Sequence, residues 1–145
     1  MHNREVNMID IALHHVSVPS SDLSRSSRFY ETVLGLKRMP RPPFTIEGIW
    51  YAIGRLQIHI TVHREANFRI GKSVDNDDVH FALRAENFEE AVAHLKDHGF
   101  DEGLAGDHPK RLILKRTGLA GFPQVFLMDP DRNVIEINGA SFNAA

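Results

Sequence analysis

Two stretches of the chain carry the same order of hydrophobic and polar positions. Residues 13–36 and residues 78–100 each open with alternating apolar and polar positions, which is typical of a half-buried strand. Each stretch then reaches a polar residue suited to begin a helix, Asp22 or Asn87, and continues with apolar residues every three or four positions. The pattern therefore predicts a strand followed by an amphipathic helix in both halves of the chain.

Further strand-like runs follow each helix. Gly35 and Gly99 stand where the helices should end, because glycine readily adopts the positive φ of a helix C-cap. Gly54-Arg55 and residues 129–133 have the composition of tight turns, and Arg116–Pro123 that of a loop. The runs expected to form strands are Leu36–Met39, Ile49–Ile53, Leu56–Val62, Phe100–Leu104, Arg111–Lys115, Val125–Met128 and Val134–Asn138. Each half thus reads β-α-β-β-β.

The fold class follows from this repeat. A single βαβββ unit leaves one face of its sheet uncovered, so two units have to pair to complete a core. A chain of 145 residues is enough for one such domain. We therefore expect an α+β domain over 1–145. Two paired βαβββ modules, about 10–70 and 77–139, would form a cup-shaped, partly open β-barrel with flanking helices, joined by the polar linker Gly71–Asp78.

Composition and charge limit the classes of partner that the protein can bind. Seventeen basic and nineteen acidic residues give a formal charge of −2, which offers no broad attraction for nucleic acid or for an acidic membrane. The first ten residues lack the apolar core of a signal peptide, and no run approaches the roughly 18 apolar residues of a membrane span. We expect a cytoplasmic protein. The chain has no cysteine, so any metal has to be held by His, Asp or Glu.

Four residues are the candidate metal ligands. Strand alternation places His15, His59, His80 and Glu136 on the polar faces of the first and last strands of the two halves, looking into the cup. Three imidazoles and one carboxylate suit one divalent transition metal, such as Fe, Mn, Co, Ni or Zn, better than Ca or Mg. A single histidine in such a strand is more often an ordinary solvated residue. Equivalent positions in both halves favour the metal site.

Other side chains are candidates for binding a substrate. Arg41, Phe44 and Trp50 belong to a basic, aromatic segment before the third strand, where Arg41 could pair with a carboxylate and the rings could wall a pocket. A proline-rich surface loop with a core tryptophan explains the segment equally well. Arg84 shares a face with His80, where it could be a second contact for an anion or simply the solvated end of its strand. Gln124 could orient substrate or water.

The sequence also resembles a known family at both ends. LHHVSVPSSDLSRSSRFYETVLGL and FLMDPDRNVIEIN are similar to the opening and closing motifs of the vicinal oxygen chelate superfamily, which includes glyoxalase I, bleomycin- and fosfomycin-resistance proteins and extradiol dioxygenases. The resemblance covers about residues 11–139. It implies paired βαβββ modules around a metal cup, commonly in a homodimer, with ligands at His15, His59, His80 and Glu136. Glyoxalase I has a glutamate at the position of His59, and Arg132 replaces the customary turn glycine.

Three functions are consistent with these features. The first is a metal-dependent lyase or isomerase of glyoxalase type, in which a small oxygenated substrate chelates the ion, an enediolate is stabilised and Glu136 is the base. The second is a non-haem Fe(II) dioxygenase of extradiol type that uses His15, His80 and Glu136. The third is a non-catalytic resistance protein that sequesters a small molecule.

Overall fold

The two halves form two modules of the predicted kind. The computed structural model describes residues 9–140. The elements of module one are β1 (His15–Ser20), α1 (Leu23–Arg28), the π-helical turn η1 (Phe29–Val33), β2 (Lys37–Met39), β3 (Gly48–Ile53) and β4 (Leu56–Val62). The elements of module two are β5 (His80–Arg84), α2 (Phe88–Asp97), β6 (Ile113–Lys115), β7 (Gln124–Met128) and β8 (Val134–Asn138). Neither helix among the described residues is long and apolar enough to cross a membrane.

Each module contains one four-stranded mixed sheet. Sheet A has the order β1-β4-β3-β2 and sheet B the order β5-β8-β7-β6. The first and last strands of each module pair in parallel, and the other pairs are antiparallel. The predicted α+β class and the two βαβββ modules are confirmed. The sheets are not closed into a barrel, and they are compatible with a cup.

The helices begin and end where the sequence predicts. Asp22 and Asn87 accept a hydrogen bond from the backbone N–H three residues later, at 3.1 Å in both cases, and so cap the helices. Gly35 and Gly99 follow the helices with φ of 69° and 89°. The first helix differs in one respect, because its second half is π-helical: the N–H of Leu34 donates to the carbonyl of Phe29, five residues earlier.

One expected strand does not form. Phe100–Leu104 contributes only a single bridge between Asp101 and Arg111, and the following strand begins at Ile113 instead of Arg111. The side chain of Asp101 accepts from the N–H of Gly103 at 2.7 Å, which turns the chain away from an extended course. The prediction of a strand there was wrong.

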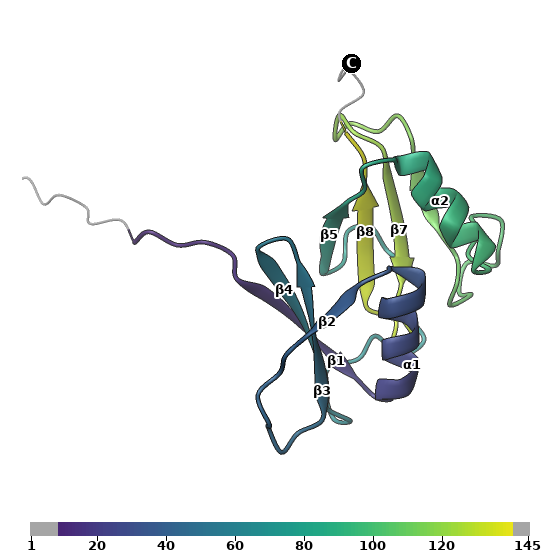
Figure 1. Cartoon of the computed structure of the whole chain (residues 1–145). Helices are drawn as coiled ribbons and strands as arrows, with labels where there is room; N and C mark the ends of the chain where they lie inside the picture. Colours follow the sequence, from purple (N-terminus) through teal and green to yellow (C-terminus); the bar gives the residue numbers. More distant parts are fainter. Residues whose placement is uncertain (1–8, 141–145) are drawn as a thin grey trace, which may run out of the picture.

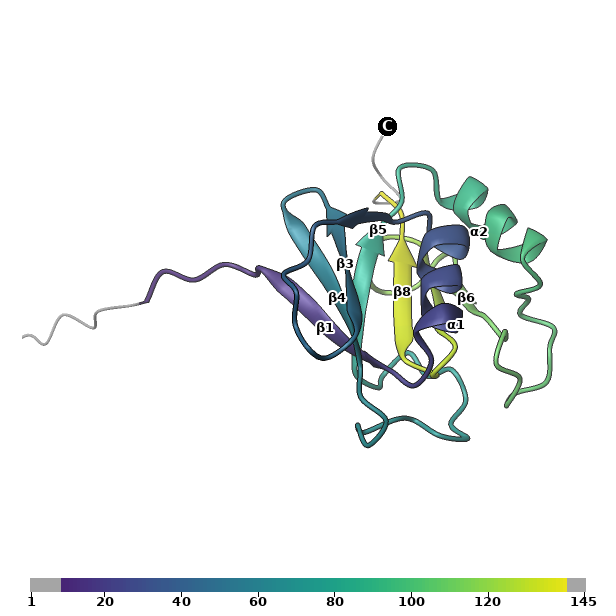
Figure 2. The same ribbon diagram turned by 60° about the horizontal axis from the view of Figure 1, so that its bottom comes forward.

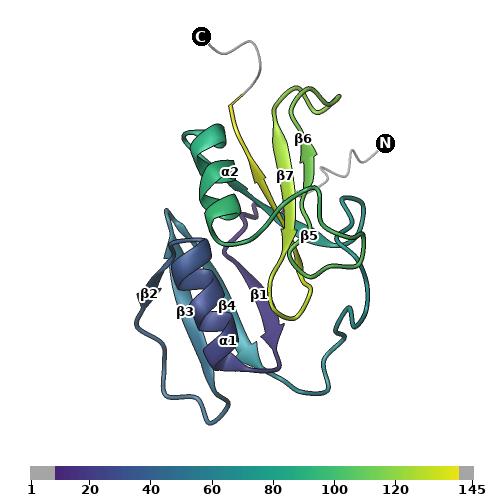
Figure 3. The ribbon, with the colours of Figure 1, turned by 90° about the vertical axis from the view of Figure 1, so that its right-hand side faces the viewer.

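Both modules pack their helices and the inner faces of their sheets onto one shared core. Figure 3 shows α1 lying over sheet A and α2 over sheet B, on the same side of the molecule. The core joins Tyr30 and Tyr51 of module one to Leu95 and Ile135 of module two, all of them almost fully buried. Each sheet therefore has an inner face toward this core and an outer face turned away from it, as the two views in Figures 1 and 2 show.

The turn between β7 and β8 ties the modules together. The hydroxyl of Tyr30 donates to Oδ2 of the buried Asp129 at 2.7 Å, and burial raises the pKa of both groups. Asp131 accepts from the backbone and side chain of Ser21, and Asn133 donates to the carbonyl of Pro19 at 3.4 Å. The closing DPDRN motif thus links module two to the start of α1 by hydrogen bonds.

Candidate functional site

The candidate ligands of module one lie on the outer face of sheet A, as strand alternation predicts. In the sheet register His15 stands beside Gln57 and His59 stands beside Ser17, while Trp50 lies opposite His59 on the neighbouring strand. Residues paired across neighbouring strands project from the same face of a sheet. The register therefore gathers the two histidines and the tryptophan on one surface.

These side chains form a continuous stack. The ring of His59 lies between those of His15 and Trp50, with centroids 4.1 Å and 4.0 Å away and interplanar angles of 17° and 5°. Phe44 continues the series at 6.1 Å from Trp50, and the guanidinium of Arg41 stands 5.0 Å from the centre of the Phe44 ring. We call these five residues the module-one row.

His59 is the best covered member of the row. Only 8% of its surface is exposed, and its Nε2 bonds Oε1 of Gln57 at 2.8 Å. Burial, and then the neighbouring charges of His15, His14 and Arg41, lower the pKa of His59. The neutral imidazole, which is the form that binds a metal, is therefore favoured at this position.

The stack limits how the two histidines can bind. The nitrogen lone pairs of an imidazole lie in its ring plane, and the planes of His15 and His59 are nearly parallel, with centroids 4.1 Å apart. A ligand nitrogen lies about 2.0–2.1 Å from an ion such as zinc, so one ion cannot lie in both planes at once. One of the two rings has to rotate before both can hold the same ion.

The outer face of sheet B carries a hydrogen-bonded carboxylate. Glu136 is only 6% exposed, and its two oxygens accept from Nε2 of Gln124 at 2.6 Å and from Nδ2 of Asn138 at 2.7 Å. Nε of Arg84 donates in turn to Oδ1 of Asn138 at 2.5 Å. We call Arg84, Gln124, Glu136 and Asn138 the module-two network.

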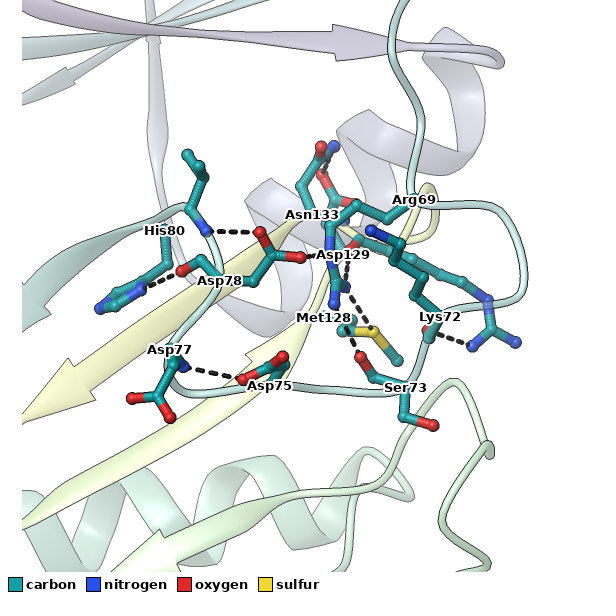
Figure 4. A network of polar contacts seen from close by, with 12 residues as sticks. Arg69, Lys72, Ser73, Asp75, Asp77, Asp78, His80, Met128, Asp129 and Asn133 are labelled. Carbon is teal, nitrogen blue, oxygen red and sulfur yellow. Dashed lines mark hydrogen bonds and ion pairs between the residues drawn. The ribbon is translucent and has the colours of Figure 1, made fainter.

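His80 lies at the edge of the same face and is held by the segment before β5. Its Nδ1 donates to the carbonyl of Asp78 at 2.7 Å (Figure 4), which leaves Nε2 as the nitrogen with a free lone pair. The ring of His80 lies nearly perpendicular to that of Phe126, with centroids 5.5 Å apart. Asp78 is itself fixed by an ion pair of 2.8 Å with Arg69. The expected linker Gly71–Asp78 has no helix or strand, but it is anchored and positions His80.

Comparison with known proteins identifies a superfamily to which this fold corresponds. The family profile for the Glyoxalase/Bleomycin resistance protein/Dioxygenase superfamily matches residues 12–137, nearly the whole chain. The chain belongs to this superfamily. The resemblance seen in the opening and closing motifs is therefore confirmed. No curated protein matches the chain.

Solved structures of the superfamily share the fold. A glyoxalase family protein from Bacillus anthracis superposes with a TM-score of 0.72 at 20% identity, covering 94% of this chain and 100% of that one. The fosfomycin resistance protein FosX from Listeria monocytogenes gives 0.64 at 16% identity, covering 93% and 97%. A bleomycin-binding protein in complex with bleomycin gives 0.62 at 21% identity, covering 92% and 100%. At these identities the likeness shows the fold alone.

Within one chain, the four candidate ligands form two pairs instead of one cluster. His15 and His59 lie on the outer face of sheet A, and His80 and Glu136 on that of sheet B, while the inner faces of both sheets meet at the core. Over residues 9–140, no group of three or more His, Asp or Glu is arranged to hold a metal ion. The donors suit a divalent transition metal chemically, but a single chain does not gather them.

Sequence reasoning missed several side chains that shape these faces. Asn138 is the second partner of Glu136, and Phe126 lies against His80; both follow from the alternation of β8 and β7, which places them on the outer face. Phe122, in the predicted loop Arg116–Pro123, lies under the guanidinium of Arg84 at 5.3 Å. No local signal in the sequence indicates that last contact.

Proposed function

We propose that this superfamily member is a metal-dependent lyase or isomerase of glyoxalase type that works as a homodimer. In the dimer, the outer face of sheet A in one copy would meet the outer face of sheet B in the other. The observation that carries this proposal is that one chain does not gather the four donors: His15 and His59 lie on sheet A, His80 and Glu136 lie on sheet B, and no three of them come together among the described residues. A second copy supplies the missing half of each site.

An exposed apolar arm supports a partner on this side. Ile9, Ile11 and Leu13 precede β1 and are 84%, 79% and 66% exposed. In an extended chain these alternate side chains lie on the same side as His15. Figure 1 shows the arm running out from β1, away from the rest of the molecule. Apolar side chains grouped in this way typically mark a surface that another protein covers.

The donor set defines what the site would hold. His15, His59, His80 and Glu136 would bind one divalent ion of the Fe, Mn, Co, Ni or Zn type. When bound, such an ion supplies a Lewis acid that polarises a substrate carbonyl. His80 already has its Nδ1 engaged by the carbonyl of Asp78, which orients Nε2 as the donor.

Glu136 is the base in this proposal. It is the one carboxylate among the four candidates, and the amides of Gln124 and Asn138 hold both of its oxygens in place. A fixed carboxylate can take the proton from the carbon beside a substrate carbonyl and return it to the neighbouring carbon. Gln124 would thus position the base, and substrate orientation remains a further role for its amide.

The remaining candidates surround the same space. Trp50 and Phe44 offer flat apolar surface beside His59, and Arg41 and Arg84 stand at the outer ends of the row and of the network. In the dimer these groups would flank the ligands from both copies. They favour a substrate that combines adjacent oxygens with a planar or anionic part.

One observation favours a second candidate function. The stack of His15, His59 and Trp50 forms an aromatic surface, and the nitrogen lone pairs of its two histidines do not converge. A protein that sequesters a flat small molecule without chemistry would use such a surface directly. This alternative predicts ligand binding that survives removal of the metal by a chelator.

The test starts from protein purified without added metal or chelator. We expect one transition-metal ion per site, and proton exchange or isomerisation of α-hydroxycarbonyl compounds that is lost in Glu136→Gln. Oxygen uptake with a catechol that requires Fe(II) would instead establish a dioxygenase. Protein that neither contains nor takes up metal would contradict the proposal and leave the sequestering function.

A further inference from the structure

A cavity lies on the helix side of the molecule. It has a volume of about 360 Å³ and lies between η1 of module one, the residues that follow α2, and the β7–β8 turn. No residue of the module-one row or the module-two network lines it. A role for this cavity is therefore separate from the proposed metal chemistry.

The floor of the cavity is apolar and rigid. Phe29 and Phe100 contribute their rings, with centroids 6.2 Å apart, and both belong to the shared core. Val33, Pro109, Met128 and Pro130 complete the apolar lining. A floor built from core residues of two modules is preformed, which is typical of small-molecule sites.

Three cationic side chains surround this floor. Arg25, Arg28 and Lys110 all line the cavity, and none of them takes part in a salt bridge between described residues. Arg25 donates to the carbonyl of Pro130 at 3.4 Å, and Lys110 donates to the carbonyl of His98 at 2.9 Å. These contacts are to neutral groups, so they leave the positive charges uncompensated.

The one acidic residue of the lining, Asp129, makes no ion pair with these cations. Oδ1 of Asp129 accepts from the backbone N–H groups of Asp131 and Asn133. Oδ2 accepts from Tyr30 and from the side-chain amide of Asn133. Both oxygens of this carboxylate are already fully engaged by four donors. A ligand with a negative charge would therefore compensate the three cations.

The backbone of η1 shapes the wall. The hydrogen bonds from Leu34 to Phe29 and from Leu36 to Tyr30 span five and six residues, so this turn is wider than an α-helical one. Three residues of the widened turn, Phe29, Thr32 and Val33, line the cavity. A π-helical turn is rare, and such turns occur frequently at functional sites.

We propose that this cavity binds a small organic anion, a carboxylate or a phosphate monoester attached to an aromatic or acyl body. The body would lie on Phe29 and Phe100, and the anionic group would bind Arg25, Arg28 and Lys110, since guanidinium and ammonium groups are the usual partners of both anions. Arg28 belongs to module one and Lys110 to module two. A ligand held by both would also stabilise the packing of the modules against each other.

The test uses three probes with the same body: 1-naphthyl phosphate, 1-naphthoate and the neutral 1-naphthylmethanol. Binding to the full-length protein is measured by titration calorimetry. We expect saturable binding of at least one anion and much weaker binding of the neutral probe. The stronger of the two anions identifies the preferred head group.

Charge-reversal and cavity-filling variants distinguish binding in this cavity from general electrostatic attraction to the protein. Arg28→Glu reverses one charge without breaking any hydrogen bond of the described structure, and it should weaken the anion at least tenfold. Val33→Trp fills the cavity without changing charge and should also abolish binding. The matched control Arg55→Glu reverses an exposed charge in the β3–β4 turn and should leave the affinity unchanged. Equal losses in Arg28→Glu and Arg55→Glu, equal binding of the neutral probe, or no saturable binding would overturn the proposal.

Discussion

The outer faces of the two sheets hold their candidate ligands by different physical means. On sheet A, His59 is held mainly by ring stacking with His15 and Trp50, together with one hydrogen bond to Gln57. On sheet B, Glu136 is held by directional hydrogen bonds from two amides. Stacked rings can slide and rotate at small cost, whereas a carboxylate bonded at both oxygens has one preferred position.

Because of this difference, we expect the two halves of the proposed site to respond differently to metal binding. The module-two network fixes Glu136 before any ligand arrives, and the carbonyl of Asp78 fixes His80. The module-one row has to adjust, since its two histidines cannot hold one ion while they stay stacked. We therefore expect metal binding to rearrange sheet A and to leave sheet B nearly unchanged.

The largest effect should come from the module-two network. Asn138→Ala removes the donor to Oε2 of Glu136 and the link to Arg84, so the carboxylate loses its fixed orientation. Loss of such a partner typically costs about 10–100-fold in metal affinity. Titration of the metal-free protein with Zn²⁺ or Co²⁺ measures the effect.

A matched control is available in the linker that precedes this module. Asn76→Ala removes an amide whose bond is to Asp77, at 3.0 Å, with no contact to Glu136. Its metal affinity should equal that of the unaltered protein. If Asn138→Ala also binds metal normally, the network does not organise the site.

The candidate faces were predictable from the sequence, but their relation was not. Alternation alone placed His15, His59, His80 and Glu136 on the correct faces, because the side chains of a strand alternate strictly. That both inner faces share one core depends on contacts between residues far apart in the chain, such as Tyr30 with Asp129. No local pattern carries that information.

The dependence on contacts between residues far apart in the chain also explains which side-chain contacts sequence reasoning missed. The stack of Trp50 on His59 needs the register of β3 against β4, which the turn at Gly54 sets and which hydrophobicity does not reveal. Conversely, Phe100–Leu104 was predicted to be a strand and contributes only a single bridge. The carboxylate of Asp101 accepts a hydrogen bond from the backbone N–H of Gly103 there, which favours a turn.

A smaller effect tests the stacking on sheet A. Trp50→Leu and His59→Leu, alone and combined, form a double-mutant cycle in urea unfolding. We expect a coupling energy of about 0.5–1.5 kcal/mol, since aromatic pairs contribute that much beyond the area they bury. A coupling energy near zero would mean that the rings lie together without stabilising each other.

The smallest effect is a pH dependence that reports on His59. Its pKa is lowered in the folded protein, so as pH falls below about 6.5 the unfolded chain takes up the proton first. Stability conferred by the neutral ring should therefore decrease as pH falls from about 6.5 through the lower folded pKa. Trp50, the single tryptophan, should report the protonation by a fluorescence change with a midpoint below 6.5.

The control for this titration is His59→Gln, in which the fluorescence change below pH 6.5 should disappear. His15, which stacks on the opposite side of His59 from Trp50, remains in that variant. A change that persists in His59→Gln would assign the signal to another group and contradict the account of the stack.

The most direct test of a site shared between two copies is complementation. One copy carries His15→Ala and His59→Ala, and the other carries His80→Ala and Glu136→Ala; they are co-expressed with different tags and the mixed dimer is isolated. If each site joins sheet A of one copy to sheet B of the other, the mixed dimer has one intact site and one without ligands. We predict one metal ion per mixed dimer and almost none in either parent. Metal content in the mixed dimer no higher than in the parents would contradict the account.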